Sequence, residues 1–343
     1  MSLASVSPYE CFVGVDIAAV TFTATWIGAV SSPDRPQQLA NTPAGFAALQ
    51  QRLQTTGVPP VATLVAMEAT GSYWVALAVA LHQAGYVVSV LNPAAVHNFA
   101  KSYLRRAKTD ALDARLLAQF AAERQPTAWT PPPEVYHQLR QRLVARDALL
   151  EMRKQAQNHR HALLQWPVVV ESVRQQLDEV VLSLGERITT LETEIAQVLQ
   201  DGAWAASATL LLSIPGVGVL TTAWLLVTTL NFGLCTTPEA AAAYAGLVPM
   251  PWESGASVRG RPTIGHGGNS HLRRALYMAT LSAARRNPLI TAFYQRLREA
   301  GKPMKVARCA AARKLLHLAW AVVTKGRPFE APTPASAVLA LAS

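Results

Sequence analysis

The sequence contains few of the residues that stabilise small domains or mark common enzymes. Its 343 residues include three cysteines, which lie far apart and form no C-x-x-C pair. Neither a disulfide framework nor a structural zinc site is therefore predicted, and a reducing compartment is favoured. The sequence also has no G-x-S-x-G elbow and no P-loop. It therefore does not support an esterase or an ATPase.

A long apolar run without interruption is also missing. The segment from Ala203 to Pro238 carries no charge, and part of it, 209–230, resembles a membrane span. However, Pro215-Gly216-Val217-Gly218 divides it, and threonines dilute the second piece. No basic segment precedes an apolar run near the N-terminus, so no signal peptide is predicted. We expect a cytoplasmic protein with no membrane partner.

Acidic residues are scarce in one stretch near the C-terminus. Between Glu253 and Arg327 there are fifteen lysines and arginines against two acids, a local net charge of +13 in a protein whose total is +10. The rest of the chain is nearly balanced. Such a one-sided block predicts a polyanionic partner bound through its phosphates. An anionic membrane surface is the alternative, but the block lacks an amphipathic helix rich in Trp and Phe.

Residues 12–125 show the alternation of strands and helices that indicates a largely buried sheet. Two apolar segments, 12–17 and 21–27, are expected to pair as a hairpin. Further strands are predicted at 64–68 and 86–91. Helices are predicted at 41–54, 72–83 and 109–124, the last with Thr109 as its N-cap.

The middle of the chain is predicted to be helical. Pro131-Pro132-Pro133 forms a rigid linker before a helix over 134–165, and Pro167 separates that helix from the next. The second helix carries a heptad of apolar residues, which is typical of a coiled coil. Its members are Leu177, Val181, Leu184, Ile188, Leu191, Ile195 and Val198. An antiparallel hairpin, an intermolecular coil and a helix packed on its own domain all fit this pattern.

From about residue 205 the chain is expected to be mostly helical. The segment Ser213–Gly218, S-I-P-G-V-G, is typical of a helix-hairpin-helix turn. There, Gly216 and Gly218 would let backbone N–H groups approach a nucleic-acid phosphate near a helix N-terminus. The alternative is a tight turn between core helices. Three more helices are predicted, beginning near 270, 287 and 303.

Four acids are the candidates for a metal site. Asp110 and Asp113 are three residues apart, so they share one face of a helix. Asp16 lies in an apolar strand and Glu68 ends another, so the two would meet at one edge of the sheet if these strands are neighbours. Oxygen ligands favour Mg²⁺, or Mn²⁺, for phosphoryl transfer. Taken one at a time, the acids could instead cap turns and helices.

A glycine-punctuated loop over 252–261 holds two serines and two arginines. The guanidinium groups of Arg259 and Arg261 can each donate two parallel hydrogen bonds to phosphate oxygens. From the residues alone, the loop is a phosphate-binding loop, and a nucleophilic serine would need a group that activates it. Ser254 and Ser257 are the two candidates.

Taken in order, these motifs resemble the DEDD transposases, which include the Piv-type DNA invertases and the bridge-RNA-guided recombinases of bacterial insertion sequences. The resemblance covers about residues 12–330. It is carried by G-V-D-I, M-E-A-T-G, K-T-D-A-L-D-A-R, S-I-P-G-V-G, Y-A-G-L-V-P, E-S-G-x-S-V-R-G and H-L-R-R-A-L-Y-M.

The resemblance implies an α/β RNase H-like (RuvC-like) domain over 1–130 and a helical coiled coil over 131–204. A mostly α transposase domain with the serine loop and a helix-hairpin-helix-like motif would span 205–331, and a flexible tail 332–343. By the same resemblance, the protein would be a nucleoid-associated dimer or tetramer that acts on donor and target DNA. A structured guide RNA would choose the target.

The resemblance also assigns roles to residues. The metal would be held by Asp16, Glu68, Asp110 and Asp113. Ser254 would attack a DNA phosphate and form a 5′-phosphoserine link, with Ser257 as its competitor. The expected phosphate contacts are Arg259, Arg261, Arg273 and Arg274. Two alternatives stay open: a hydrolytic, resolvase-type nuclease that uses water, and a non-catalytic nucleic-acid scaffold.

Overall fold

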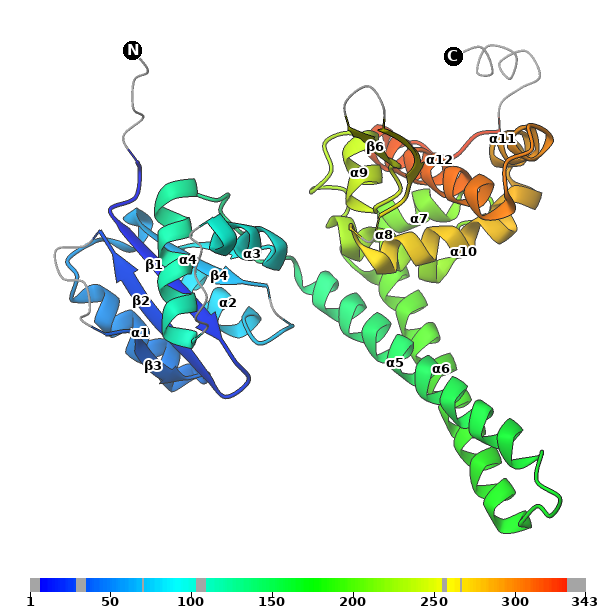
Figure 1. The fold of residues 1–343 in the computed structure, drawn as a ribbon, viewed down its shortest axis with the longest axis horizontal. Coiled ribbons are helices and arrows are strands. Elements are labelled where there is room, and N and C mark those ends of the chain that lie inside the picture. The colour runs from blue at the N-terminus through cyan, green and yellow to red at the C-terminus, as the bar shows by residue number, and fades with distance from the viewer. Residues whose placement is uncertain are drawn as a thin grey trace. The chain divides into compact units, whose positions relative to one another are not determined.

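The computed structural model describes residues 7–28, 35–69, 71–102, 109–254, 258–265 and 267–331, with the backbone alone for 251–262. The chain forms two compact units, Met1–Pro131 and Pro132–Ser343 (Figure 1). The expected tail, 332–343, lies outside the described residues.

The first unit is built on a sheet of five described strands. These are β1 (Cys11–Ile17), β2 (Thr21–Ile27), β3 (Gln37–Ala40), β4 (Thr63–Glu68) and β5 (Val87–Leu91). Their order in the sheet is β3-β2-β1-β4-β5. The first three strands are antiparallel neighbours, whereas β4 and β5 run parallel to β1. This mixed α/β architecture is consistent with the expected RNase H-like fold.

Helices cover both faces of this sheet. Helices α1 (Pro43–Gln54) and α2 (Val75–Gln83) pack on one face, where their leucines share a core with Val13, Val15 and Met67. On the other face, α3 (Pro93–Ser102) and α4 (Asp110–Arg124) pack against Leu64 and Ala66. The alternation of side chains along each strand supplies the two apolar faces.

Helix α4 begins as the sequence predicts. Thr109 is its N-cap and accepts a hydrogen bond from the Leu112 backbone N–H at 3.3 Å. Helices α1 and α2 begin later than expected, at Pro43 and Val75, because Thr42 is the N-cap of α1 and residues 71–74 form a turn. The first turn of α4 is thus fixed by its own cap.

The second unit begins with a hairpin of two long helices, α5 (Glu134–Leu163) and α6 (Glu171–Asp201), seen in green in Figure 1. The antiparallel hairpin is therefore the arrangement that the described chain adopts. The base of the hairpin belongs to the core of the helices that follow, since Leu139, Leu143 and Ile195 are fully buried in that core. The base of the predicted coiled coil and the following helices therefore share one hydrophobic core.

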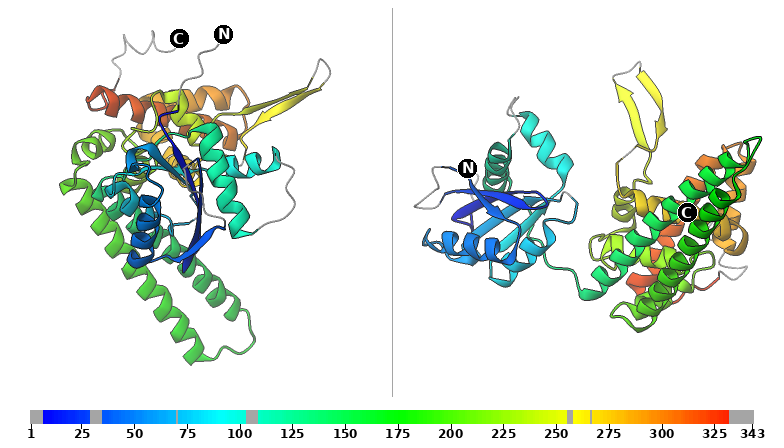
Figure 2. Two further views of the ribbon diagram at one scale, coloured as in Figure 1. Left: turned by 90° about the vertical axis from the view of Figure 1, so that its left-hand side faces the viewer. Right: turned by 90° about the horizontal axis from the view of Figure 1, so that it is seen from below.

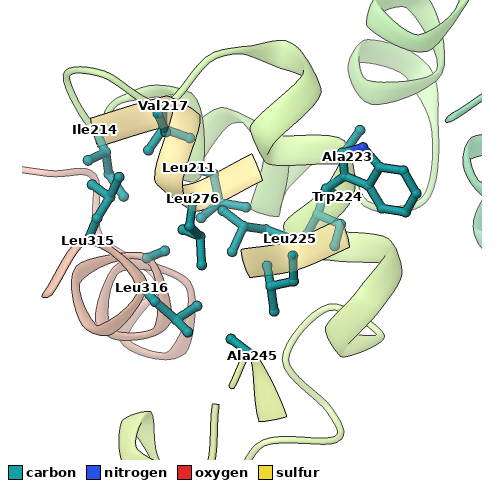
Figure 3. Close-up of a cluster of buried hydrophobic side chains, with 14 of the residues drawn as sticks. Leu211, Ile214, Val217, Ala223, Trp224, Leu225, Ala245, Leu276, Leu315 and Leu316 are labelled. Carbon is teal, nitrogen blue, oxygen red and sulfur yellow. The ribbon is translucent and has the colours of Figure 1, made fainter. Parts of the chain in front are cut away.

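The remaining helices pack around the apolar segment that resembles a membrane span. They are α7 (Ala205–Leu212), α8 (Val219–Thr229), α9 (Pro238–Tyr244), α10 (Ser270–Arg286), α11 (Pro288–Glu299) and α12 (Met304–Lys325). Every residue of α8 from Thr222 to Thr229 is buried, and Leu225 contributes to the cluster drawn in Figure 3. The apolar run is thus the central helix of a folded core. Within the described parts of the chain, no helix has the length and apolarity to cross a membrane.

The glycine-punctuated segment is a two-stranded ribbon, so the predicted loop is wrong here. Strands β6 (Met250–Ser254) and β7 (Val258–Thr263) pair antiparallel with an irregularity between Met250 and Trp252. Figure 2 shows this ribbon extending away from the helices of its own unit. Both strands are edge strands, where proline, which cannot donate a ladder hydrogen bond, is tolerated.

Candidate active site

Two of the candidate acids lie at the ends of neighbouring strands. Strands β1 and β4 are parallel, and Val15 is opposite Met67. Asp16 and Glu68 are the next residues on each strand, and both are half-buried. The parallel register therefore brings these two acids side by side at the carboxyl edge of the sheet. The adjacency that the sequence predicts for them is thus present in the backbone.

Both acids occupy the sheet face that α4 covers. Side chains alternate along a strand, so Gly14 and Asp16 share one face, as do Ala66 and Glu68. Ala66 belongs to the core cluster that α4 closes. At Gly14 the helix backbone is so near that a Cβ would lie 2.0 Å from the Ala114 carbonyl oxygen. Glycine at this position therefore allows α4 to pack directly on β1.

The first turn of α4 carries the other two acids. Asp110 is exposed, and Asp113 is half-buried. Asp110 lines a surface hollow that Thr23 and Gln38 also line. Thr23 is the cross-strand partner of Asp16, and Gln38 is opposite Thr23. The helix start therefore lies over the sheet at the level of Asp16.

Asp16, Glu68, Asp110 and Asp113 are called the four acids below; the first two lie on the sheet face that α4 covers, and the other two lie on the first turn of α4 itself. Carboxylate oxygens are the donors that Mg²⁺ and Mn²⁺ prefer, so the donor type fits a hard divalent cation. Among the described residues, no three His, Cys, Asp or Glu side chains come close enough to share one metal ion. The four acids are thus donors of a suitable type, but no three of these described side chains lie close enough to bind one ion together.

The candidate nucleophile lies on the ribbon of the second unit. Ser254 is the last residue of β6 and is opposite Val258, and Glu253 is opposite Arg259. Ser257 lies outside the described residues, as do the side chains of Ser254, Arg259 and Arg261. The backbone thus establishes that Ser254 stands at the far end of a strand.

Arg273 ties together the two chain segments at the base of the ribbon. Its guanidinium donates hydrogen bonds to the carbonyl oxygens of Gly267, at 2.7 Å, and Ala245, at 3.5 Å. Next to it, the Asn269 backbone N–H donates to the Tyr244 carbonyl oxygen at 2.7 Å. The sequence gives no signal for this role, which depends on residues more than twenty positions apart. Arg273 remains a candidate phosphate contact, now with an internal function as well.

Arg274 also has an intramolecular partner. It forms an ion pair with Asp147 of α5, and the His271 ring lies 3.5 Å from the same carboxylate. The Asp147 side chain is 16% exposed, and that of Arg274 is 62% exposed. The His271 ring stacks on Trp224, with ring centroids 4.4 Å apart. These contacts fix the first turn of α10 against α5 and α8.

The two glycines of the predicted helix-hairpin-helix turn differ in their surroundings. Gly216 has a φ of +97°, and a Cβ there would lie 2.5 Å from the Ala283 Cα atom. Its lack of a side chain therefore allows close packing on α10. This agrees with the alternative that the sequence left open, a tight turn between core helices. Gly218 precedes α8 as its N-cap, and no atom lies within 4 Å of the place that its Cβ would take. Only Gly218 therefore has room for an approaching phosphate.

Two family models match the chain. A family model described as a transposase matches residues 13–166, and a second, described as transposase IS116/IS110/IS902 family, matches residues 208–295. Together the two models cover both units. The protein is thus of the transposase and recombinase class of enzymes, as the sequence predicts.

Known proteins resemble the chain over most of its length. The pilin gene-inverting proteins of Moraxella lacunata and Moraxella bovis are each 32% identical over 327 residues, which is 94% of this chain and 98% of theirs. The transposase for insertion sequence element IS1328 of Yersinia enterocolitica is 28% identical over 307 residues, 78% of this chain and 85% of its own. The chain belongs to the IS116/IS110/IS902 family of transposases. The predicted resemblance to DEDD transposases is confirmed.

Proposed function

We propose that this protein cuts and rejoins DNA strands through a covalent link between Ser254 and a DNA 5′-phosphate, assisted by a divalent cation at the four acids. The observation that carries the proposal is the position of Asp16 and Glu68 at adjacent strand ends, on the sheet face that α4 covers. The relatives named as a transposase and as gene-inverting proteins support DNA as the substrate.

The four acids would hold the cation and so define the place of the scissile phosphate. When bound, a divalent cation neutralises phosphate charge and stabilises both the attacking and the leaving oxygen. The protein contributes rigidity, because the sheet backbone fixes two of the acids and a capped helix turn fixes the other two. Such preorganisation is the protein's part in stabilising the charge that develops in the transition state.

Ser254 would act as the nucleophile. Its Oγ atom forms a bond to phosphorus as the bond from phosphorus to the DNA 3′-oxygen breaks. The serine proton is released, and the 3′-oxygen leaves as a hydroxyl after taking up a proton. The products are a 5′-phosphoserine and a free 3′-OH.

Rejoining would reverse these steps with a different partner strand. A 3′-OH of that strand attacks the phosphoserine, restores a phosphodiester and regenerates the serine hydroxyl. One phosphate ester is exchanged for another at each step, so no external energy source is required. The lack of a P-loop in the sequence agrees with such a scheme.

The partners belong to the same proposal. The basic block from Glu253 to Arg327 supports a phosphate-rich partner, and its charge would serve RNA as well as DNA. We propose a structured guide RNA and a homodimer or tetramer, because the family resemblance implies both. Arg259, Arg261 and Gly218 are the proposed phosphate contacts in the second unit.

The test uses purified protein with its co-purifying RNA, Mg²⁺ and labelled DNA that carries the junction of the parent element. After a denaturing protein gel, a labelled band at the mass of the protein is expected for the wild type. The band should be missing in Ser254→Ala and after EDTA, and present in the matched control Ser257→Ala.

Other outcomes would contradict the proposal in distinct ways. Cleaved DNA without a labelled protein band would indicate a hydrolytic nuclease. A band that persists in Ser254→Ala and disappears in Ser257→Ala would move the nucleophile to Ser257. Unchanged activity in both Asp16→Ala and Asp110→Ala would exclude a catalytic role for the four acids.

A further inference from the structure

The loop that follows β4 exposes an aromatic side chain. Tyr73 follows Glu68 by five residues, and its side chain is 51% exposed. The next residue, Trp74, is anchored instead. Its indole N–H donates a hydrogen bond to the Gly71 carbonyl oxygen at 3.2 Å, and its ring packs edge-on against Trp129 at a centroid distance of 5.6 Å. The anchored neighbour holds the loop while Tyr73 remains open to solvent.

One amide side chain attaches this loop to the end of β1. Asn41 Nδ2 donates to the Tyr73 carbonyl oxygen at 3.2 Å and to the Ala18 carbonyl oxygen at 3.1 Å. Ala18 follows Asp16 by two residues, so the Asn41 side chain also contacts the segment that directly follows Asp16. Both partners of Asn41 are acceptors, which only the amide nitrogen can satisfy. Tyr73 is therefore held at the sheet edge where Asp16 and Glu68 end their strands.

A second apolar side chain is tied to the same bridge. Val20, in the turn between β1 and β2, is 75% exposed, and its carbonyl oxygen accepts a hydrogen bond from the Asn41 backbone N–H at 2.8 Å. Neither Tyr73 nor Val20 contributes to the described hydrophobic core. Two exposed apolar side chains thus stand at the edge where the DNA strand would be cut. A ring and an aliphatic group at such a place suit the flat face of a nucleobase.

We propose that Tyr73 stacks on an unpaired nucleobase next to the scissile phosphate and so positions the strand at the four acids. This inference depends on the proposed function and adds a binding residue to it. Stacking on an aromatic ring tolerates any base, because every base has a π-face. Loss of one such stacking contact is expected to weaken binding of the DNA strand by about 5- to 150-fold.

The experiment compares Tyr73→Phe with Tyr73→Ala in strand cleavage of the junction DNA. The Phe variant keeps the ring and should cleave like the wild type. The Ala variant should lose about 5- to 150-fold in kcat/KM, carried mainly by KM. Val61→Ala is the matched control, because Val61 is 69% exposed at the opposite end of β4, and it should change nothing.

DNA with an abasic site at a chosen position identifies the nucleobase on which Tyr73 stacks. With the wild type, removing the base at one position beside the junction should reproduce the loss seen with Tyr73→Ala. On that abasic DNA, Tyr73→Ala should add no further loss, since the stacked pair is already broken. An Ala variant equal to the wild type, or losses that multiply at every position, would overturn the proposal.

Photo-crosslinking separates this inference from the cleavage chemistry. Asp16→Asn protein is irradiated with junction DNA that carries 5-iodouracil at successive positions, and the linked peptide is identified by mass spectrometry. A crosslink on Tyr73 is expected at the position found with abasic DNA. If the wild type does not cut DNA but Tyr73 crosslinks, the proposed function fails and the stacking contact stands. If the wild type cuts and no position crosslinks to Tyr73, the stacking contact is refuted alone.

Discussion

Replacement of Gly14 by alanine should separate α4 from β1 and thereby disturb the four acids. The new Cβ would lie 2.0 Å from the Ala114 carbonyl oxygen and 2.3 Å from the Ala118 backbone nitrogen. Both are helix backbone atoms, so no side-chain rotation can relieve the overlap. A carbon atom normally approaches a carbonyl oxygen to about 3.3 Å. The helix must therefore move away by about 1 Å.

That displacement predicts two separate losses. Overpacking of this kind costs about 1–3 kcal/mol of the free energy of unfolding, and more when backbone must move. A shift of about 1 Å in catalytic groups costs roughly 100-fold in rate. Because Asp110 and Asp113 lie on the displaced helix, strand cleavage should fall by about that factor in the fraction that remains folded.

Urea unfolding and the DNA cleavage gel measure these two losses in Gly14→Ala. The matched control is Gly185→Ala in α6, where the new Cβ would meet only the Arg153 guanidinium at 3.7 Å. That control should keep full stability and activity, since alanine favours a helix over glycine by about 1 kcal/mol. Wild-type stability and cleavage in Gly14→Ala would refute the close packing of α4 on β1.

Three further predictions concern the elements around the site. Thr109→Ala removes the N-cap of α4 and should lower the free energy of unfolding by about 1 kcal/mol in urea, whereas Thr109→Ser should not. Asp147→Asn removes the carboxylate that Arg274 and Arg146 share and should lower the free energy of unfolding by about 0.2–1 kcal/mol, because Arg274 is largely exposed; a double-mutant cycle with Arg274→Ala that shows no coupling would contradict the ion pair. Burial raises the pKa of the Cys11 thiol to about 11, above its ordinary 9.0, because the folded protein disfavours the thiolate. The buried neutral thiol therefore makes its full contribution to the free energy of unfolding below pH 9, and this contribution disappears as the pH rises toward 11. The urea midpoint should therefore fall more steeply over this range in the wild type than in Cys11→Ala.

The sequence predicts those elements that carry strong local patterns. Short apolar runs identify β1, β2, β4 and β5, and the N-cap Thr109 identifies the start of α4. Strand β3 and helix α3 escape prediction. The first has only the residues Gln37–Ala40 on the sheet edge, and the second buries only Val96 and Phe99. Their stability comes from neighbours in space, and a local pattern does not contain that information.

The same distinction applies to the site. The adjacency of Asp16 and Glu68 is predictable, because the ends of parallel strands in one sheet meet at one edge. The partner of Arg274 is not, since Asp147 lies 127 positions away on another helix. The pairing of β6 with β7 also had no signal in apolar alternation. Long-range polar contacts and short ribbons are thus the features that sequence reasoning missed.

The internal contacts of Arg273 and Arg274 change how the charge of the basic block should be interpreted. Arg274 pairs with the Asp147 carboxylate, which it shares with Arg146, so part of its charge is compensated within the protein. Arg273 donates only to neutral carbonyl groups, and these leave its charge uncompensated. It can therefore hold the base of the ribbon and still contribute to the positive field that attracts phosphates. A count of arginines overstates the charge that nucleic acid meets, whereas the identity of each partner shows which arginines keep their charge available.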